Sequence, residues 1–196
     1  LAFGHRRLAI VDLTEQGNQP MQDHRSGCVL TYNGEIYNYL ELKAELEKQC
    51  YSFHSHTDTE VILAAYDYWG SACVERFNGM WSFAIYDPSK KIVFCSRDRF
   101  GVKPFYYTCQ KDVFAFGSEI RQLLPLLSEV RADPAVLMDF LVHRVAENIH
   151  KSFFADVLKL PGGHNLQFDL NSGQYRVERY YDLMLAANAD TLDDPD

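Results

Sequence analysis

Short aromatic and β-branched runs, separated by turn residues, fill the middle of the sequence and limit its fold more than any other feature. Residues 81–87 and 92–96 flank the turn Pro88-Ser89-Lys90-Lys91, and residues 105–107 and 113–116 flank a second polar turn. Runs this short and this closely joined predict antiparallel hairpins. Helical patterns precede and follow them, so the sequence predicts an α+β fold in which helices cover antiparallel sheets.

The flanking segments extend this pattern. Thr57 and Glu60 have capping-box spacing before an apolar run that ends at Gly70, which predicts a helix between them. Apolar spacing and Pro134 at a first turn predict further helices. The expected helices are 39–49, 57–70, 120–127 and 134–143, and the further expected strands are 4–13, 28–31, 51–56, 165–168 and 174–181.

The stretch Tyr32-Asn33-Gly34-Glu35 carries the strongest local hint of chemistry. We expect Asn33-Gly34 to break the strand that precedes it, as a turn dipeptide does. Gly34 has no Cβ, so its N–H can approach a ligand closely, and beside the Asn33 amide it resembles an oxyanion hole. Glu35 could hold an ammonium group. An ordinary hairpin turn explains the same dipeptide, and it is the more frequent case.

Two more charged positions are ambiguous on local pattern alone. Arg6 and Arg7 are adjacent on an expected strand, so they point to opposite faces and one of them needs a partner. An Arg inside a cleft binds carboxylates well, but an ordinary edge-strand Arg is at least as frequent. Asp58 lies in the first turn of an expected helix, where the helix dipole favours an acid without any further role.

Charge and cysteine usage exclude several classes of function. The chain has a net charge of −8 and no basic stripe, so nucleic acid is not expected as a partner. We expect no signal peptide, and no apolar run comes near the roughly 20 residues that span a bilayer. The five cysteines form no CxxC pair and no metal-ligand spacing with the histidines, which predicts no metal site and free thiols in the cytoplasm.

Six ordered segments closely resemble the class II glutamine amidotransferase domain of glutamine-hydrolysing asparagine synthetases. The likeness runs from Leu1 to about Leu183. The segments are Gly4-His5-Arg6-Arg7-Leu8-Ala9-Ile10-Val11-Asp12, Tyr32-Asn33-Gly34-Glu35-Ile36-Tyr37-Asn38, Thr57-Asp58-Thr59-Glu60-Val61-Ile62, Phe77-Asn78-Gly79-Met80-Trp81-Ser82-Phe83-Ala84, Arg97-Asp98-Arg99-Phe100-Gly101-Val102-Lys103-Pro104 and Phe116-Gly117-Ser118-Glu119.

The resemblance implies a four-layer α-β-β-α sandwich of the N-terminal-nucleophile hydrolase type, and hydrolysis of L-glutamine to glutamate and ammonia. It implies an oxyanion hole made by the Asn33 side chain and the Gly34 N–H. It further implies that Arg7 binds the α-carboxylate of glutamine and that backbone groups of Leu8 and Ile10 line the pocket. By the same resemblance, Glu35 and Asp58 hold the α-amino group.

One feature of the family is missing from the sequence. Its nucleophile is a Cys at the start of the mature chain, and none of the five cysteines here is N-terminal. We therefore expect a fold incomplete at its N-terminus and a chain that does not itself hydrolyse glutamine. Residues 1–183 are expected to be the partial amidotransferase domain and residues 184–196 a linker.

The resemblance also implies a partner domain. In the family an ATP-dependent synthetase domain follows, so ATP and Mg²⁺ are expected in the parent protein and no cofactor in this chain. A homodimer is left open. Two alternatives stay beside the asparagine synthetase: a relative that amidates another carboxylate, and a non-catalytic glutaminase-like scaffold. The presence of Arg7, Asn33, Gly34, Glu35 and Asp58 argues against the scaffold, because a decayed site would be free to lose them.

Overall fold

The computed structural model describes residues 1–6, 17–110, 113–145 and 148–185. Two antiparallel sheets form its centre. The strands are β1 (Met21–Gln22), β2 (Val29–Ile36), β3 (Gly79–Asp87), β4 (Ile92–Arg97), β5 (Tyr106–Gln110), β6 (Val113–Gly117), β7 (Leu158–Lys159), β8 (His164–Asp169) and β9 (Tyr175–Arg179). The α-helices are α1 (Tyr39–Glu47), α2 (Asp58–Trp69), α3 (Cys73–Arg76) and α4 (Pro134–His143), and the 3₁₀ turns are η2 (Gly70–Ala72), η3 (Ile120–Gln122) and η4 (Leu124–Leu126).

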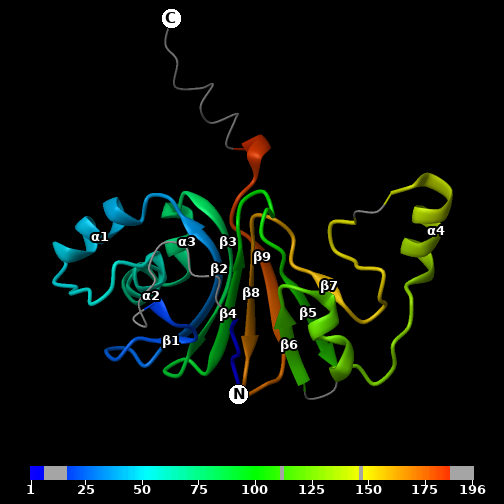
Figure 1. Cartoon of the computed structure of the whole chain (residues 1–196), viewed down its shortest axis with the longest axis horizontal. Coiled ribbons are helices and arrows are strands. Elements are labelled where there is room, and N and C mark those ends of the chain that lie inside the picture. Colours follow the sequence, from blue (N-terminus) through cyan, green and yellow to red (C-terminus); the bar gives the residue numbers. More distant parts are fainter. Residues whose placement is uncertain (7–16, 111–112, 146–147, 186–196) are drawn as a thin grey trace, which may run out of the picture.

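The strands form a large sheet in the order β1-β2-β3-β4-β8-β9 and a small sheet in the order β6-β5-β7. In Figure 1, helices α1, α2 and α3 lie on the outer side of the large sheet, the small sheet lies on its other side, and α4 lies beyond the small sheet. The layers therefore follow the order α-β-β-α. The predicted α+β sandwich is confirmed.

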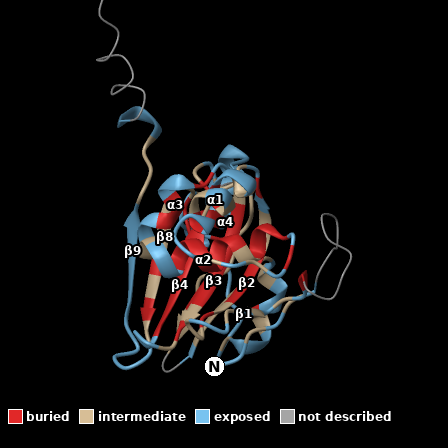
Figure 2. Cartoon of the chain, turned by 90° about the vertical axis from the view of Figure 1, so that its left-hand side faces the viewer, coloured by how far each residue is buried: buried red, intermediate tan, exposed pale blue. Residues whose placement is uncertain are grey.

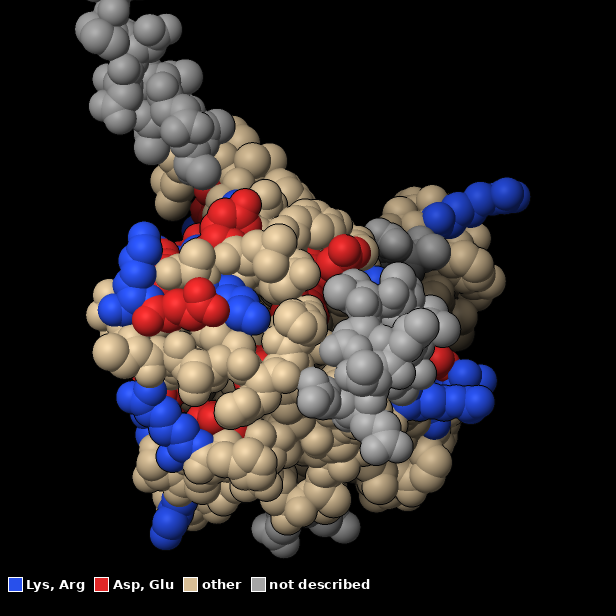
Figure 3. All heavy atoms as spheres, turned by 60° about the vertical axis from the view of Figure 1, so that its left-hand side comes forward, with Lys and Arg blue, Asp and Glu red and all other residues tan. Residues whose placement is uncertain are grey.

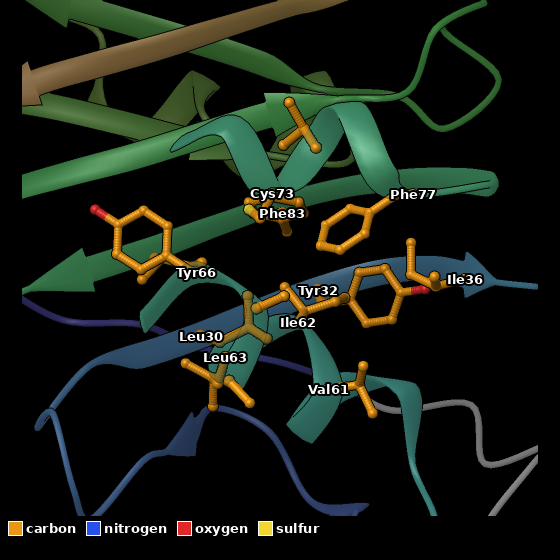
Figure 4. Packing of buried hydrophobic residues seen from close by; sticks show 14 of the residues in the cluster. Leu30, Tyr32, Ile36, Val61, Ile62, Leu63, Tyr66, Cys73, Phe77 and Phe83 are labelled. Atoms are coloured by element: carbon orange, nitrogen blue, oxygen red, sulfur yellow. The ribbon is translucent and has the colours of Figure 1, made fainter. Parts of the chain in front are cut away.

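The main core lies between the helices and the large sheet. Figure 4 shows Phe83 on β3 and Leu30 on β2 facing side chains of α2 such as Ile62, with Cys73 enclosed among them. A second cluster, which includes Ala84, Phe105 and Leu166, fills the space between the two sheets. Burial in Figure 2 follows the same pattern, with the central strands and the inner face of α2 buried.

Helix α2 begins and ends as its sequence predicts. The Thr57 hydroxyl accepts a hydrogen bond from the Glu60 N–H, and Gly70 ends the helix with a φ of 62°. The Glu60 carboxylate, however, accepts hydrogen bonds from the N–H groups of His54 and Ser55 rather than from that of Thr57. Because α2 satisfies these donors, residues 51–56 need no neighbouring strand and form none, and the strand predicted there was wrong.

Two other local predictions were also wrong. Strand β2 runs straight through Asn33-Gly34, which pair with Ser82 and Trp81 of β3. Gly34 does not have the positive φ that a hairpin turn of this type requires. Ladder pairing with β3 therefore overrides the turn preference of the dipeptide.

The helix predicted over 120–127 is instead the two 3₁₀ turns η3 and η4. Pro125 has no N–H to donate to a preceding carbonyl, so a continuous α-helix is unfavourable there. Residues 4–6 form no strand, and residues 7–13 of that predicted strand lie outside the described part of the chain. The two-residue strands β1 and β7 were not predicted, because so short a run has no periodicity.

Helix α4 has the predicted bounds but leaves most of its apolar side chains exposed. Of its residues only Val136 is buried, whereas Met138, Leu141 and Val142 are 59%, 67% and 60% exposed. In Figure 3, acidic and basic side chains are interspersed over the face shown, with no continuous basic stripe.

Candidate active site

A large pocket lies between β2 of the large sheet and the corner that follows β6 of the small sheet. Its volume is about 800 Å³, within the range of small-molecule sites. It is lined by the N-terminal residues Gly4–Arg6, by Thr31–Glu35 of β2, by the start of α2, by β3, and by residues 116–119 after β6. The pocket therefore collects segments that are far apart in the sequence.

The edge of β2 at this pocket is open. Strand β1 pairs only with Val29 and Leu30, so the rest of that edge has no strand neighbour among the described residues. Beyond β1, the Tyr32 N–H donates to the Gln19 side chain at 2.6 Å, and the Ile36 N–H donates to the Asp58 carboxylate at 2.9 Å. Side chains thus take the place of a neighbouring strand.

The Gly34 N–H lies between these two donors and points the same way, because alternate residues of a strand direct their N–H groups to the same side. The N–H groups of the residues in between face the opposite side. The Tyr37 N–H, for example, donates to the Asn78 carbonyl at 2.7 Å, toward β3. Within the described part of the chain, the Gly34 N–H has no hydrogen-bond acceptor. It is available to a ligand in the pocket.

Gly34 is also required by packing. A Cβ built on it would lie 2.2 Å from the Met80 carbonyl oxygen and 2.7 Å from the Trp81 Cα. These contacts are with backbone atoms, which cannot move aside without disturbing β3. The glycine therefore serves the close approach of two strands at the point where its N–H faces the pocket.

Asn33 presents its carboxamide on the face of the sheet that looks toward the small sheet. Its Nδ2 donates to the Ser118 Oγ at 3.4 Å, a contact between residues 85 positions apart. An amide –NH₂ has two donors, so one N–H is left for a ligand. Asn33 and Gly34 thus supply a side-chain donor and a backbone donor at neighbouring positions, as an oxyanion hole requires.

Asp58 connects α2 to β2. Its buried carboxylate accepts hydrogen bonds from the Tyr32 hydroxyl at 2.7 Å and from the Ile36 N–H through the same oxygen. Burial and the charge of Asp58 raise the pKa of Tyr32 well above its ordinary value, so the phenol stays protonated and donates. Thr57, not Asp58, caps this helix. The second oxygen of Asp58 accepts no hydrogen bond from the described residues.

Charges of both signs surround the pocket. Glu35 and Arg6 are exposed at the rim, and Lys103 is half-buried. Glu119 and Arg121 form an ion pair there. A pocket with separate cations and anions suits a zwitterion such as a free amino acid.

Four of the predicted site residues come together in this pocket: Asn33, Gly34, Glu35 and Asp58. The other three, Arg7, Leu8 and Ile10, lie outside the described residues. Sequence reasoning missed the roles of Gln19, which covers the β2 edge, and of Ser118, which contacts Asn33. No local pattern identifies them, because both act on partners distant in the sequence.

The cysteines lie elsewhere. All five are free, and none lines the pocket. Cys28, Cys73 and Cys95 are buried, and burial raises the pKa of each thiol above its ordinary value. A buried thiol with a raised pKa is a poor nucleophile.

Across the described residues, no group of three His, Cys, Asp or Glu side chains could hold a metal ion. No helix in those ranges has the length and apolar character to cross a bilayer.

Comparison with protein families gives a match over almost the whole chain. Residues 1–181 match the model of the glutamine amidotransferase domain family. A Methanocaldococcus jannaschii protein, placed by its name among the glutamine-hydrolysing asparagine synthetases, is 40% identical over 93% of this chain and 38% of its own length. The glutamine-hydrolysing asparagine synthetase 3 of Bacillus subtilis is 35% identical over 98% of this chain and 31% of its own length. The chain therefore spans about a third of these relatives.

A solved structure has the same fold. The glutamine phosphoribosylpyrophosphate amidotransferase of Bacillus subtilis, determined with ADP and GMP, aligns with a TM-score of 0.61 and 18% identity. The alignment covers 90% of this chain and 34% of that one. At this identity the likeness establishes the fold, of the N-terminal-nucleophile amidotransferase type, and nothing about the ligands.

Proposed function

Because the chain belongs to the family of glutamine amidotransferase domains, we propose that it forms the glutaminase site of an asparagine synthetase. The site would hydrolyse glutamine to glutamate and ammonia, and the ammonia would amidate aspartate in a second domain. The 35–40% identity to proteins named as glutamine-hydrolysing asparagine synthetases supports this parent enzyme.

One observation carries the proposal: the open edge of β2. There the Gly34 N–H, without an acceptor among the described residues, lies beside the Asn33 amide, and the buried Asp58 carboxylate lies next along the edge. Arranged this closely in one pocket, the hydrogen-bond donors can bind the side-chain carbonyl of a glutamine molecule while the carboxylate binds its α-amino group.

In the proposed reaction a thiol adds to the side-chain carbonyl carbon of glutamine. The carbonyl oxygen becomes an oxyanion that accepts hydrogen bonds from Asn33 Nδ2 and the Gly34 N–H. The intermediate collapses by breaking the C–N bond, and the proton from the thiol leaves with the amide nitrogen as ammonia. Water then hydrolyses the thioester to glutamate and restores the thiol.

In this proposal the thiol comes from outside this sequence, since none of its five cysteines is among the described residues that line the pocket. We assign it to a Cys at the start of the mature parent chain, whose α-amino group would act as the base. The pocket volume of about 800 Å³ leaves room for such a segment beside a bound amino acid.

Recognition of the α-carbon end of glutamine needs one cation and at least one anion. We assign the α-carboxylate to Arg7, with backbone contacts from Leu8 and Ile10, and the α-amino group to Asp58 and Glu35. Asp58 fits this role because the Tyr32 hydroxyl and the Ile36 N–H both donate to one of its oxygens and leave the other oxygen for the ligand.

The parent protein would carry the remaining chemistry. In this proposal residues 1–183 are the amidotransferase domain, residues 184–196 lead to an ATP- and Mg²⁺-dependent synthetase domain, and the enzyme works in the cytoplasm, where the free cysteines stay reduced. The alternative is the same glutaminase site attached to a domain that amidates another carboxylate. Assaying ammonia transfer to aspartate against other carboxylates distinguishes the two.

The test of the glutaminase site is the substitution Asn33→Ala in the full-length parent protein. We expect the turnover number for glutamate release to fall about a hundredfold or more, the usual effect of losing one oxyanion donor. Asn171→Ala, in the exposed turn between β8 and β9, is the matched control. An unchanged rate in Asn33→Ala would remove Asn33 from the oxyanion hole, and a wild-type parent that releases no glutamate would overturn the proposed function.

A further inference from the structure

The contact between Asn33 and Ser118 spans the pocket from one sheet to the other. Asn33 lies on β2 of the large sheet, and Ser118 follows β6 of the small sheet. We propose that Ser118 is a positioning residue, which holds the Asn33 carboxamide in the orientation that lets its second N–H reach the oxyanion. This inference rests on the proposed function, because it assigns Asn33 to glutamine hydrolysis.

The chemical reason lies in the freedom of an asparagine side chain. The torsion next to its amide group is broad, so an amide without a partner samples many orientations. A donor stabilises a transition state only when it is already aimed at the developing charge. The Ser118 hydroxyl accepts one N–H of Asn33 and thereby limits the direction of the other, which extends from the same nitrogen.

The corner that carries Ser118 is built to stay in place. On one side, Gly117 packs so closely that a Cβ on it would lie 2.4 Å from the Gln122 side-chain oxygen. That oxygen accepts a hydrogen bond from the Glu119 N–H at 3.1 Å, and the Glu119 side chain completes a capping box on η3. The residues before and after Ser118 are therefore held by η3.

The preceding strand fixes the same corner to the core. The Phe116 ring stacks on Phe105 with centroids 5.5 Å apart and contacts Phe3 edge to face at 5.4 Å. Phe105 is buried between the two sheets. The Ser118 hydroxyl is thus supported by a packed strand on one side and a capped turn on the other, as the support of a catalytic donor needs to be.

The experiment is a double-mutant cycle on glutamate release by the full-length parent protein. We expect Ser118→Ala to lower kcat about tenfold through loss of alignment, with KM for glutamine changed less than about twofold. Ser118→Thr keeps the hydroxyl, and we expect it to regain most of kcat. In the Asn33→Ala background, Ser118→Ala should have little further effect, because its target is gone. Ser172→Ala, in the exposed β8–β9 turn, is the matched serine control.

The outcomes separate this inference from the one on which it rests. If Asn33→Ala is impaired but Ser118→Ala keeps the wild-type kcat, the role of Ser118 is overturned and the proposed function stands. The role is also overturned if Ser118→Ala lowers kcat by the same factor with and without Asn33, since that result indicates a general structural effect. A wild-type parent without glutaminase activity overturns both proposals.

Discussion

At the scale of single residues, the pocket shows how one carboxylate can stabilise the fold and remain available to a ligand. Asp58 uses one oxygen to join α2 to β2 through Tyr32 and Ile36. Its other oxygen accepts no hydrogen bond from the described residues. The same carboxylate can therefore hold two elements together and still bind an ammonium group.

Asp87 is a second buried carboxylate, and it gives a prediction on pH. Burial opposes its ionisation, but hydrogen bonds from Lys90 and Ser89 outweigh burial and lower its pKa to about 2. Because the folded-state pKa lies below the unfolded one, the stability it contributes is complete above the unfolded value, near pH 4, and is lost as the pH falls toward 2.

We therefore expect Asp87→Asn to lower the free energy of unfolding by about 1–2 kcal/mol at pH 7, because the charge-assisted bonds are lost. The difference from wild type should shrink as the pH falls from 4 to 2. Urea unfolding followed by circular dichroism at several pH values measures it. A difference that is constant over this range would show that the charge of Asp87 does not stabilise the fold.

At the scale of elements, β2 depends on the absence of a side chain at Gly34. Gly34→Ala would place a methyl group 2.2 Å from the Met80 carbonyl oxygen, so β2 and β3 would have to separate locally. We expect the free energy of unfolding to fall by about 3 kcal/mol, which is at the upper end of the range for overpacking. Thermal unfolding of the chain measures it.

Gly4→Ala is the matched control for this prediction, because a Cβ on Gly4 would meet no atom within 4 Å. We expect Gly4→Ala to unfold at the wild-type temperature. A Gly34→Ala protein as stable as Gly4→Ala would mean that β2 tolerates a side chain there, and that Gly34 is required only for its N–H.

At the scale of the whole molecule, Arg97 connects the large sheet to the segments that lead into the small sheet. From the end of β4, its guanidinium donates to the carbonyls of Lys103 at 2.6 Å, Gly101 at 2.7 Å and Leu160 at 2.6 Å. Lys103 and Gly101 lie between β4 and β5, and Leu160 follows β7. One planar side chain thus joins two loops between the sheets through three hydrogen bonds.

We expect Arg97→Met to lower the free energy of unfolding by about 3 kcal/mol or more, because three partly buried carbonyls would lose their donor. Arg97→Lys should recover only part of this free energy of unfolding, since an ammonium group cannot reproduce the planar fork of the guanidinium. Arg176→Met, on the exposed strand β9, is the control and should change little. If Arg97→Met unfolds at the same urea concentration as Arg176→Met, Arg97 does not hold the two sheets together.

Local patterns determined much of the fold. Thr57 and Gly70 bound α2 because a cap and a left-handed glycine act within one helical turn, and Pro134 begins α4 for the same kind of reason. The hairpin of β3 and β4 follows from its short connecting turn. Each of these signals depends on a few neighbouring residues, so the sequence alone is sufficient to read it.

Tertiary structure decided the conformation wherever local signals conflict or are absent. Asn33-Gly34 has the composition of a turn, yet pairing with β3 keeps it in a strand, and the energy of that ladder depends on residues about 50 positions away. The open edge of β2 and the Ser118 contact likewise arise only when β1, α2 and the β6 corner come together. The sequence by itself determined the elements and the kinds of chemical groups, whereas the folded chain decided which of those groups face one pocket, because long-range packing sets their distances and directions.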